Sequence, residues 1–333
     1  MSIFNRKSRV LITGAKGQLG SYLVDYFKRS NIRSVVGIDI ADLDIANPLD
    51  IEQFFDKNPK FDYVIHCAAI TNTTLIEQNP ESSYLANVLG PRNIAEQCAK
   101  HNIKLIHIST DYVLSEKSPI VNNDIQEFPV NQYGLQKLLA EQFIKQAYQA
   151  KPNDYVILRS SWMYGNSSNS FIEKFLTNCI ESYYNSSSAE VHIPVANDAY
   201  GRPSPVWVIA YKLSDLLNPS VFKRSRIINL QDEYPQISRY DWACFIWNEF
   251  LEILDAKLSG SITSTINDYK AKIKVVPEKS SNIGLSKLHH PGLIKDNKKY
   301  LDNNFSYFKD TRLYILNNID KLKFKLIRNC PVV

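Results

Sequence analysis

The sequence lacks the features that mark several large classes of protein. No run approaches the roughly 18 consecutive apolar residues of a transmembrane helix, so no membrane span is expected. Residues 1–9 contain no apolar segment of the kind that directs secretion. Internal repeats and low-complexity tracts are also missing.

Disulfide and metal-ligand patterns are missing as well. The cysteines are odd in number, five in all, and no two are spaced like metal ligands. The six histidines form no His-x-x-x-His pair. This usage indicates a reducing, cytoplasmic compartment and no bound metal.

Charge of one sign is not concentrated in this chain. The 39 basic and 34 acidic residues leave a net charge of +5, and charged residues make up 22% of the sequence. Scattered surface lysines explain this balance better than a nucleic-acid-binding stripe, so no nucleic-acid partner is expected. A mild positive bias would help to attract a diphosphate.

Strand-like and helix-like segments alternate through the first half of the chain. Short β-branched runs predict strands at residues 9–13, 34–39, 62–66, 104–109 and 155–159, and helical patterns occupy 18–30, 48–58, 80–101 and 131–149. Strands separated by helices of this length imply right-handed crossovers and a parallel sheet. We therefore expect a Rossmann-like, doubly wound α/β domain over residues 1–165.

The alternation weakens after about residue 165. Helical patterns recur at 171–184, 206–217 and 238–254, a further strand is predicted at 226–230, and residues 256–292 are polar and irregular. We expect residues 166–333 to form mainly a smaller, mixed α/β substrate-binding domain across the carboxyl edge of the sheet. An alternative is that the strand at 226–230 belongs to the first domain.

A glycine-rich turn follows the first predicted strand. Residues 14–20 (GAKGQLG) have the spacing Gly-x-x-Gly-x-x-Gly and precede a helix. Glycines let the backbone approach a pyrophosphate, and a helix N-terminus favours the anion. Ordinary strand–helix joints also use such turns, but the position after the first strand favours an NAD(P) cofactor. The expected contacts are Gly14, Lys16, Gly17, Gln18 and Leu19.

Asp39 ends the second predicted strand. A carboxylate at this place can accept hydrogen bonds from the ribose hydroxyls of the adenosine and would repel a 2′-phosphate, which favours NADH over NADPH. The alternative is an acid that merely forms the turn after the strand. Ile40, Asp44 and Ile45 follow as further candidate contacts to the adenosine.

Tyr133 and Lys137 lie four residues apart on a predicted helix, so their side chains share one face. A nearby ammonium stabilises a phenolate, lowers the pKa of the phenol from about 10 and makes it a better proton donor. The same lysine can hold the nicotinamide ribose. Such a pair taken alone is typical of an ordinary helix surface. Its place after a dinucleotide turn and four predicted strands favours catalysis.

Thr110 lies at the carboxyl end of the fourth predicted strand, within residues 109–112 (STDY). Ligands of open parallel sheets bind just beyond such ends. Its hydroxyl could donate to a substrate oxygen beside Tyr133, or it could simply cap the strand.

Together these segments resemble the extended short-chain dehydrogenases and, more narrowly, the dTDP-4-dehydrorhamnose reductase family. The matching segments are 14–20, 64–71 (VIHCAAIT), 87–90 (NVLG), 108–113 (ISTDYV), 133–141 (YGLQKLLAE) and 158–165 (LRSSWMYG). The Thr-Asp-Tyr and Ser-Trp pieces are the most specific. Residues 197–204 (NDAYGRPS) and 279–285 (KSSNIGL) match more loosely, and Lys279-Ser280 replaces the family's Arg-Pro.

The resemblance implies a role for each matching residue. Thr110, Tyr133 and Lys137 would be catalytic, and Thr71 would lie between cofactor and sugar. Further cofactor contacts would come from Ala68, Ala69, Thr71 and Asn87. Substrate contacts would come from Asp111, Tyr112, Trp162, Arg202 and Asn282. Trp162 also has an alternative interpretation as a core aromatic.

The activity that the resemblance implies is NAD(P)H-dependent reduction of the C4 ketone of a nucleotide-linked 4-keto-6-deoxyhexose, with dTDP-4-dehydrorhamnose or its UDP equivalent as the first candidate. Tyr112 stands where related dehydratases have a catalytic Glu. Asp111 stands where related epimerase-reductases have a Cys, and the His of those enzymes is missing between residues 162 and 175.

Two alternatives remain open. One is reduction of a UDP-2-acetamido-2,6-dideoxy-4-hexulose. The other is a non-catalytic regulatory subunit like that of methionine adenosyltransferase, although those proteins lack the Ser-Trp found at residues 161–162. The oligomeric state is also open, with a homodimer as one option.

Overall fold

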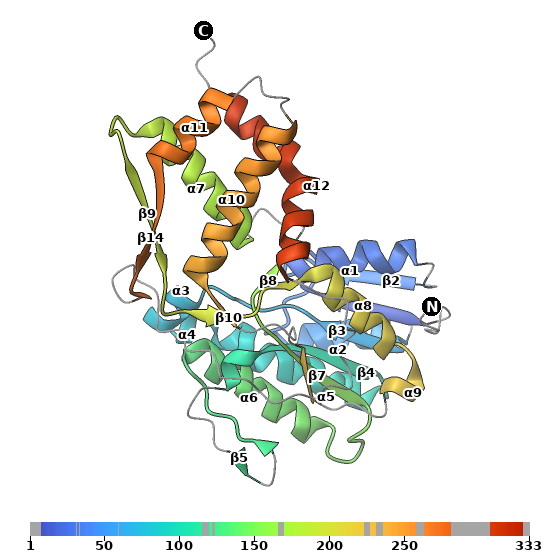
Figure 1. Cartoon of the computed structure of the whole chain (residues 1–333). Coiled ribbons are helices and arrows are strands. Elements are labelled where there is room, and N and C mark those ends of the chain that lie inside the picture. The colour runs from blue at the N-terminus through green and yellow to red at the C-terminus, as the bar shows by residue number, and fades with distance from the viewer. Residues whose placement is uncertain are drawn as a thin grey trace.

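The computed structural model describes residues 8–30, 32, 34–58, 60–114, 120–121, 124–165, 170–222, 227–230, 236–257, 263–280 and 307–328. A parallel sheet with helices on both faces forms the lower part of the molecule in Figure 1, and a group of helices with a two-stranded ribbon stands above it. None of the described helices is both long and apolar enough to span a membrane.

Six strands form the central sheet. They are β1 (Arg9–Thr13), β2 (Ser34–Ile38), β3 (Tyr63–His66), β4 (Lys104–Thr110), β7 (Tyr155–Ser160) and β12 (Ile227–Leu230). Their order is β12-β7-β4-β3-β1-β2, and every neighbouring pair is parallel. The chain leaves β1 toward β2 and later returns to β3 on the other side of β1. This reversal opens a crevice at the carboxyl ends of the strands, where ligands bind in such sheets.

Helices cover both faces of this sheet (Figure 1). α1 (Gln18–Arg29) and α8 (Val206–Leu216) pack on one face, and α2 (Pro48–Lys57), α5 (Gly90–Lys100) and α6 (Gln132–Ala147) pack on the other. The side chains of β1 alternate between the two cores, as the pleat requires: Val10 and Ile12 point to α1, and Leu11 points to α2. The predicted doubly wound α/β fold is thereby confirmed.

The upper layer has its own core of buried aromatic and aliphatic side chains. It is built from α7 (Phe171–Asn185), α10 (Arg239–Lys257), α11 (Thr263–Lys272), α12 (Tyr307–Arg328) and the ribbon of β9 (Val191–Ala196) with β14 (Ile273–Glu278). The expectation that residues 256–292 are irregular was wrong for their described part, which contains α11 and β14. β14 completes its hydrogen bonds with β9, about 80 residues earlier in the chain, so no local pattern signals it.

The remaining described elements are short. They are α3 (Thr73–Gln78), the 3₁₀ turn η2 (Asp111–Val113), β5 (Ile120–Val121), β6 (Asp124–Ile125), β8 (Met163–Tyr164), β10 (Tyr200–Gly201), β11 (Ser204–Pro205), α9 (Pro219–Phe222) and β13 (Ile237–Ser238). The single helix predicted at residues 80–101 is divided into α4 (Glu81–Tyr84), a π-helical segment η1 (Leu85–Leu89) and α5. β12 pairs with β7 in the first sheet, although it follows residue 165 in the chain. The division of the chain into two domains at residue 165 therefore remains a proposal.

A buried ion pair joins the helix that carries Tyr133 to the sheet. Arg159 of β7 donates to both carboxylate oxygens of Glu141 on α6, at 3.0 and 2.6 Å, and Ser109 of β4 donates to the same carboxylate at 2.6 Å. The Glu141 side chain is fully buried and that of Arg159 is 4% exposed. Glu127 provides a second carboxylate for Arg159 at 2.7 Å. A buried pair of this kind is costly to break from one side, because the remaining charge is left uncompensated.

We expect Glu141→Gln to lower the free energy of unfolding by about 3 kcal/mol, the usual size for breaking a buried pair. Glu96→Gln is the matched control, because Glu96 pairs with Arg92 on the exposed face of α5 and such pairs contribute about 1 kcal/mol or less. Urea denaturation of both variants measures the difference. Equal, small losses would show that the buried network does not hold α6 against the sheet.

Candidate active site

The glycine turn after β1 is shaped by close backbone contacts. Gly14 has a φ of 65°, a conformation that favours glycine. A Cβ on Gly20 would lie 2.1 Å from the carbonyl oxygen of Gly14, so only a residue without a side chain lets α1 start against the turn. The helix N-terminus therefore faces the crevice beyond β1 and β3, as an anion-binding turn requires.

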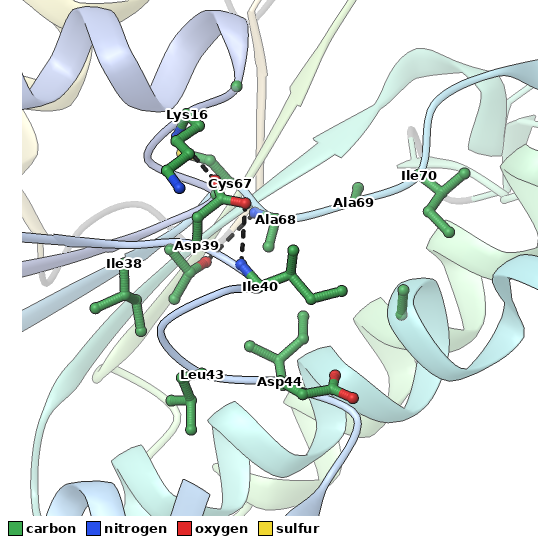
Figure 2. A pocket seen from close by; sticks show the side chains of 15 residues that line it. Lys16, Ile38, Asp39, Ile40, Leu43, Asp44, Cys67, Ala68, Ala69 and Ile70 are labelled. Carbon is green, nitrogen blue, oxygen red and sulfur yellow. Dashed lines mark hydrogen bonds between the residues drawn. The ribbon is translucent and has the colours of Figure 1, made fainter. Parts of the chain in front are cut away.

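A cavity of about 380 Å³ lies beside this turn, at the ends of β1, β2 and β3 (Figure 2). Nine of the residues predicted to contact the cofactor line it: Gly14, Lys16, Gly17, Asp39, Ile40, Asp44, Ile45, Ala68 and Ala69. Its other lining residues include Leu43, Cys67 and Ile70. The cavity has mostly apolar walls with a few polar groups, which suits an adenosine.

Asp39 has two functions in this cavity. Its carboxylate accepts hydrogen bonds from the backbone N–H of Lys16 at 2.8 Å and from its own neighbour Ile40 at 2.9 Å (Figure 2). It therefore ties the end of β2 to the glycine turn and also lines the cavity. The turn-forming role and the ligand-binding role are compatible, since a carboxylate has about four acceptor positions.

A second cavity, of about 400 Å³, continues from the first toward the upper layer. Gly17, Cys67 and Ala69 line both cavities, so the two form one groove. Besides Gly17 and Ala69, eight predicted site residues line the second cavity: Gln18, Leu19, Thr71, Thr110, Asp111, Tyr112, Tyr133 and Trp162. The groove thus runs from the predicted adenosine site past Tyr133 to the upper layer.

Tyr133 is held in the first turn of α6. Asn131 caps this helix, with its side-chain oxygen accepting from the backbone N–H of Gly134 at 2.8 Å. A Cβ on Gly134 would lie 2.2 Å from the carbonyl oxygen of Tyr112, so this glycine lets α6 approach the end of β4. The rings of Tyr112 and Tyr133 meet edge to face, with 6.1 Å between their centroids.

Thr110 and Trp162 also line the second cavity. The Thr110 hydroxyl accepts from the backbone N–H of Tyr112 at 3.2 Å, which caps the turn after β4. The indole N–H of Trp162 donates to the phenol oxygen of Tyr112 at 3.3 Å. Trp162 packs in the core of the upper layer and also lines the cavity. Its interpretation as a core aromatic is therefore compatible with its interpretation as a substrate contact.

Lys137 is buried and lines neither cavity. Its ammonium donates to Nε2 of His107 at 3.0 Å and to the carbonyl oxygen of Ile108 at 2.8 Å, which places the proton of His107 on Nδ1. His107 in turn stacks on His66, and Nδ1 of His66 is 2.7 Å from the Thr13 hydroxyl. Burial lowers the pKa of Lys137 to about 8.

The expected lowering of the Tyr133 pKa was wrong for this geometry. Burial, followed by the nearby Tyr112 and Asp111, raises the pKa of the Tyr133 phenol above its ordinary value. The Lys137 ammonium does not offset this shift, because it is hydrogen-bonded to His107 and Ile108 of β4 and not to the phenol. At neutral pH Tyr133 is therefore a protonated, neutral phenol.

Two other predicted residues, Asn87 and Arg202, do not line the groove, and a third is outside the described residues. Asn87 is buried, and its amide accepts from the N–H of Ile70 at 2.8 Å and donates to the carbonyl of Ile70 at 3.0 Å, so it positions the strand-end loop. Arg202 is buried, and its backbone N–H donates to the Ser161 hydroxyl. Asn282 is outside the described residues.

The groove also includes residues that were not predicted. Cys67, Thr73, Ser160, Ser161 and Met163 lie in or next to motif segments, whose spacing does signal them. Arg239 is different, because it reaches the second cavity from the start of α10, far along the chain. Within the described ranges, no group of three or more His, Cys, Asp or Glu side chains could hold a metal ion.

Comparison with known proteins gives consistent matches. The family model described as RmlD substrate binding domain matches residues 8–291. A dTDP-4-dehydrorhamnose reductase of Mycobacterium tuberculosis is 29% identical over 251 residues, which are 73% of this chain and 76% of that protein.

Solved structures agree in fold. The crystal structure of a dTDP-4-dehydrorhamnose reductase from Clostridium acetobutylicum has a TM-score of 0.73 at 25% identity and covers 95% of this chain and 99% of its own. A dTDP-4-dehydrorhamnose reductase from Bacillus anthracis, solved in complex with NADP, has the same TM-score at 24% identity and covers 93% of this chain and 99% of its own.

The burial of Lys137 predicts a pH-dependent stability. Above pH 8 the folded chain releases a proton that the unfolded chain, with an ordinary lysine pKa of 10.5, still binds. Stability rises with pH wherever the unfolded state binds more protons. The free energy of unfolding of the wild type, minus that of Lys137→Met, should therefore increase from about pH 8 upward, by at most about 1.4 kcal/mol per pH unit.

Urea titrations between pH 7 and pH 9.5 measure this difference. Lys28→Met removes an exposed lysine of α1 and is the control, for which the difference should stay flat. A flat curve for Lys137→Met as well would show that Lys137 is not desolvated in the folded protein.

Proposed function

From the premise that this chain belongs to the RmlD substrate binding domain family, that of the dTDP-4-dehydrorhamnose reductases, we propose that it reduces the C4 ketone of a nucleotide-linked 4-keto-6-deoxyhexose with NAD(P)H. dTDP-4-dehydrorhamnose, or its UDP-linked equivalent, is the substrate that this membership favours. The observation that carries the proposal is the continuous groove, in which Thr110 and Tyr133 line a cavity that also includes Gly17 and Cys67 of the dinucleotide side.

The groove fits a dinucleotide with its nicotinamide end beside Tyr133. Only glycine can occupy position 20, and the apolar first cavity ends at Asp39 and Asp44. Bound NAD(P)H would supply the hydride that reduces C4. The residues of this chain that would hold it are Gly14, Lys16 and Gly17 at the diphosphate, Asp39 at the ribose, and Ala69 with Thr71 toward the nicotinamide.

The chain itself supplies the proton and stabilises the oxygen that gains charge. Tyr133 is neutral at physiological pH, which is the state that a general acid needs, and it donates its proton to the developing alkoxide. Thr110 donates a hydrogen bond to the same oxygen. Lys137 lies one turn further along α6, but its ammonium is hydrogen-bonded to His107 and Ile108, so it would have to turn toward Tyr133 in the loaded enzyme to favour proton loss from the phenol. Donors that are already in place at such an oxygen usually give the largest catalytic effect.

The residues beside Thr110 disfavour elimination of water from the sugar. A dehydratase would need a base next to Asp111, but burial raises the pKa of Tyr112 to about 12, so this phenol remains protonated. Tyr112 and Trp162 are better suited to contact the sugar ring, since their hydrogen bond fixes both rings at the cavity surface.

We expect Tyr133→Phe to retain cofactor binding and to lose at least about 100-fold in kcat, the usual contribution of one general acid. Tyr148→Phe is the control, because Tyr148 follows the same helix, is buried, donates to the carbonyl of Ile103 at 2.7 Å and lines neither cavity. Stopped-flow or steady-state oxidation of NAD(P)H measures kcat, and quenching of protein fluorescence measures cofactor binding. Near-normal turnover in Tyr133→Phe would contradict the assignment.

Asp39 leads us to propose a preference for NADH, because its carboxylate would repel a 2′-phosphate at the end of the first cavity. We expect Asp39→Asn to raise kcat/KM for NADPH relative to NADH by about 10-fold, equivalent to about 1.4 kcal/mol. Asp42→Asn changes the net charge equally without altering the lining of that cavity and should leave the ratio unchanged. An unchanged ratio in both variants would remove Asp39 from cofactor selection.

The alternative substrates and the alternative class are separated by one assay. NADH and NADPH oxidation is followed with dTDP-, UDP- and GDP-linked 4-ketosugars, including a UDP-2-acetamido-2,6-dideoxy-4-hexulose, and the products are identified. Reduction of a 6-deoxy-4-ketosugar supports the proposal. If no ketosugar is reduced while a methionine adenosyltransferase is bound, the chain is a regulatory subunit instead.

A further inference from the structure

Arg239 brings a positive charge from the upper layer into the second cavity. It is the first residue of α10, where its backbone N–H donates to the carbonyl of Ala199. Its guanidinium lies over the ring of Trp162, with 4.6 Å between Cζ and the ring centroid, and it is 5.1 Å from the centroid of Phe171. These two rings hold the plane of the guanidinium, and the residue lines the cavity beside Tyr112.

The guanidinium has no anionic partner among the described residues. Its Nε is buried without a hydrogen-bond partner, and it forms no ion pair with Asp111, the acidic side chain in the lining of the same cavity. Arg159 shows the contrast, since that buried guanidinium is paired with Glu127 and Glu141. Arginine stays protonated in proteins, and a desolvated charge without a partner is costly. Stacking on aromatic rings offsets part of that cost but leaves the buried Nε–H without a hydrogen-bond partner.

We propose that Arg239 recognises an oxyanion of the substrate, donating two hydrogen bonds to a phosphate group of the nucleotide diphosphate. This inference rests on the proposed function, because it assigns the anionic part of that substrate. A planar guanidinium matches two oxygens of a phosphate or carboxylate and binds them more strongly than neutral groups do. Because Arg239 lies against Trp162, the anion is held next to the sugar and helps to orient C4 toward Tyr133.

A carboxylate on the sugar would offer the same chemistry, so the binding test separates the two sources. Affinities of inorganic pyrophosphate, dTDP, dTDP-glucose and UDP-glucuronate are measured by titration calorimetry for the wild type, Arg239→Gln and Arg239→Lys. NADH is titrated in parallel. Arg92→Gln, which removes an exposed arginine of α5, is the control.

For Arg239→Gln we expect the affinity for dTDP and dTDP-glucose to fall by about 10- to 100-fold, the usual effect of losing a hydrogen-bonded charged group. Arg239→Lys should recover part of the loss, because it keeps the charge without the two-pronged geometry. NADH affinity should stay within about two-fold, and the effect on turnover should appear in KM more than in kcat. Added salt should weaken binding to the wild type more than to Arg239→Gln.

The outcomes distinguish this inference from the proposed function. Loss of pyrophosphate and dTDP binding in Arg239→Gln supports the inference even if no ketosugar is reduced. A loss restricted to UDP-glucuronate overturns the phosphate assignment in favour of a sugar carboxylate. Equal affinities in the wild type and Arg239→Gln, or no binding of these anions to the wild type, overturn the inference, whereas ketosugar reduction by the wild type would still support the proposed function.

Discussion

The whole candidate site depends on one constraint, which is that all six strands of the central sheet run in the same direction. Their carboxyl ends therefore meet at one edge, and the loops after β1, β2, β3, β4 and β7 all emerge there. The reversal of strand order around β1 separates the loops after β1 and β3 enough to leave the groove. Gly17 and Trp162, which are 145 positions apart in the chain, consequently line one cavity.

The buried chain of polar groups under this edge explains how a lysine can be kept away from water. Lys137 is satisfied by His107 and by a strand carbonyl, and the neutral imidazoles of His66 and His107 extend the chain toward Thr13. Burial lowers the pKa of His66 to about 3, so this imidazole stays neutral and does not repel the ammonium. The ammonium of Lys137 is thus held against β4, and the phenol of Tyr133 remains neutral. The fully buried pair of Glu141 and Arg159 anchors the same helix one turn further on.

The upper layer completes the groove by contributing Arg239 from the start of α10. Trp162 and Arg239 meet across the boundary between the two layers, and the hydrogen bond from Trp162 reaches Tyr112 at the sheet edge. The second cavity is therefore lined by aromatic rings and the guanidinium of Arg239, whereas the first cavity has mostly apolar walls. The first cavity therefore suits the adenosine of the proposed cofactor, and the second suits the proposed sugar nucleotide.

The amino-acid sequence alone determined the order of strands and helices in the first half, the glycine turn and most of the lining of both cavities. It could do so because these features are local: β-branched runs, helical periods and motif spacing are set by residues close together in the chain. The tertiary structure alone decided the pairing of β9 with β14, the return of β12 to the sheet, the direction in which Lys137 makes its hydrogen bonds and the presence of Arg239 in the groove. Each of these depends on packing between segments far apart in sequence, where burial and the available partners, not neighbouring residues, set the free energy.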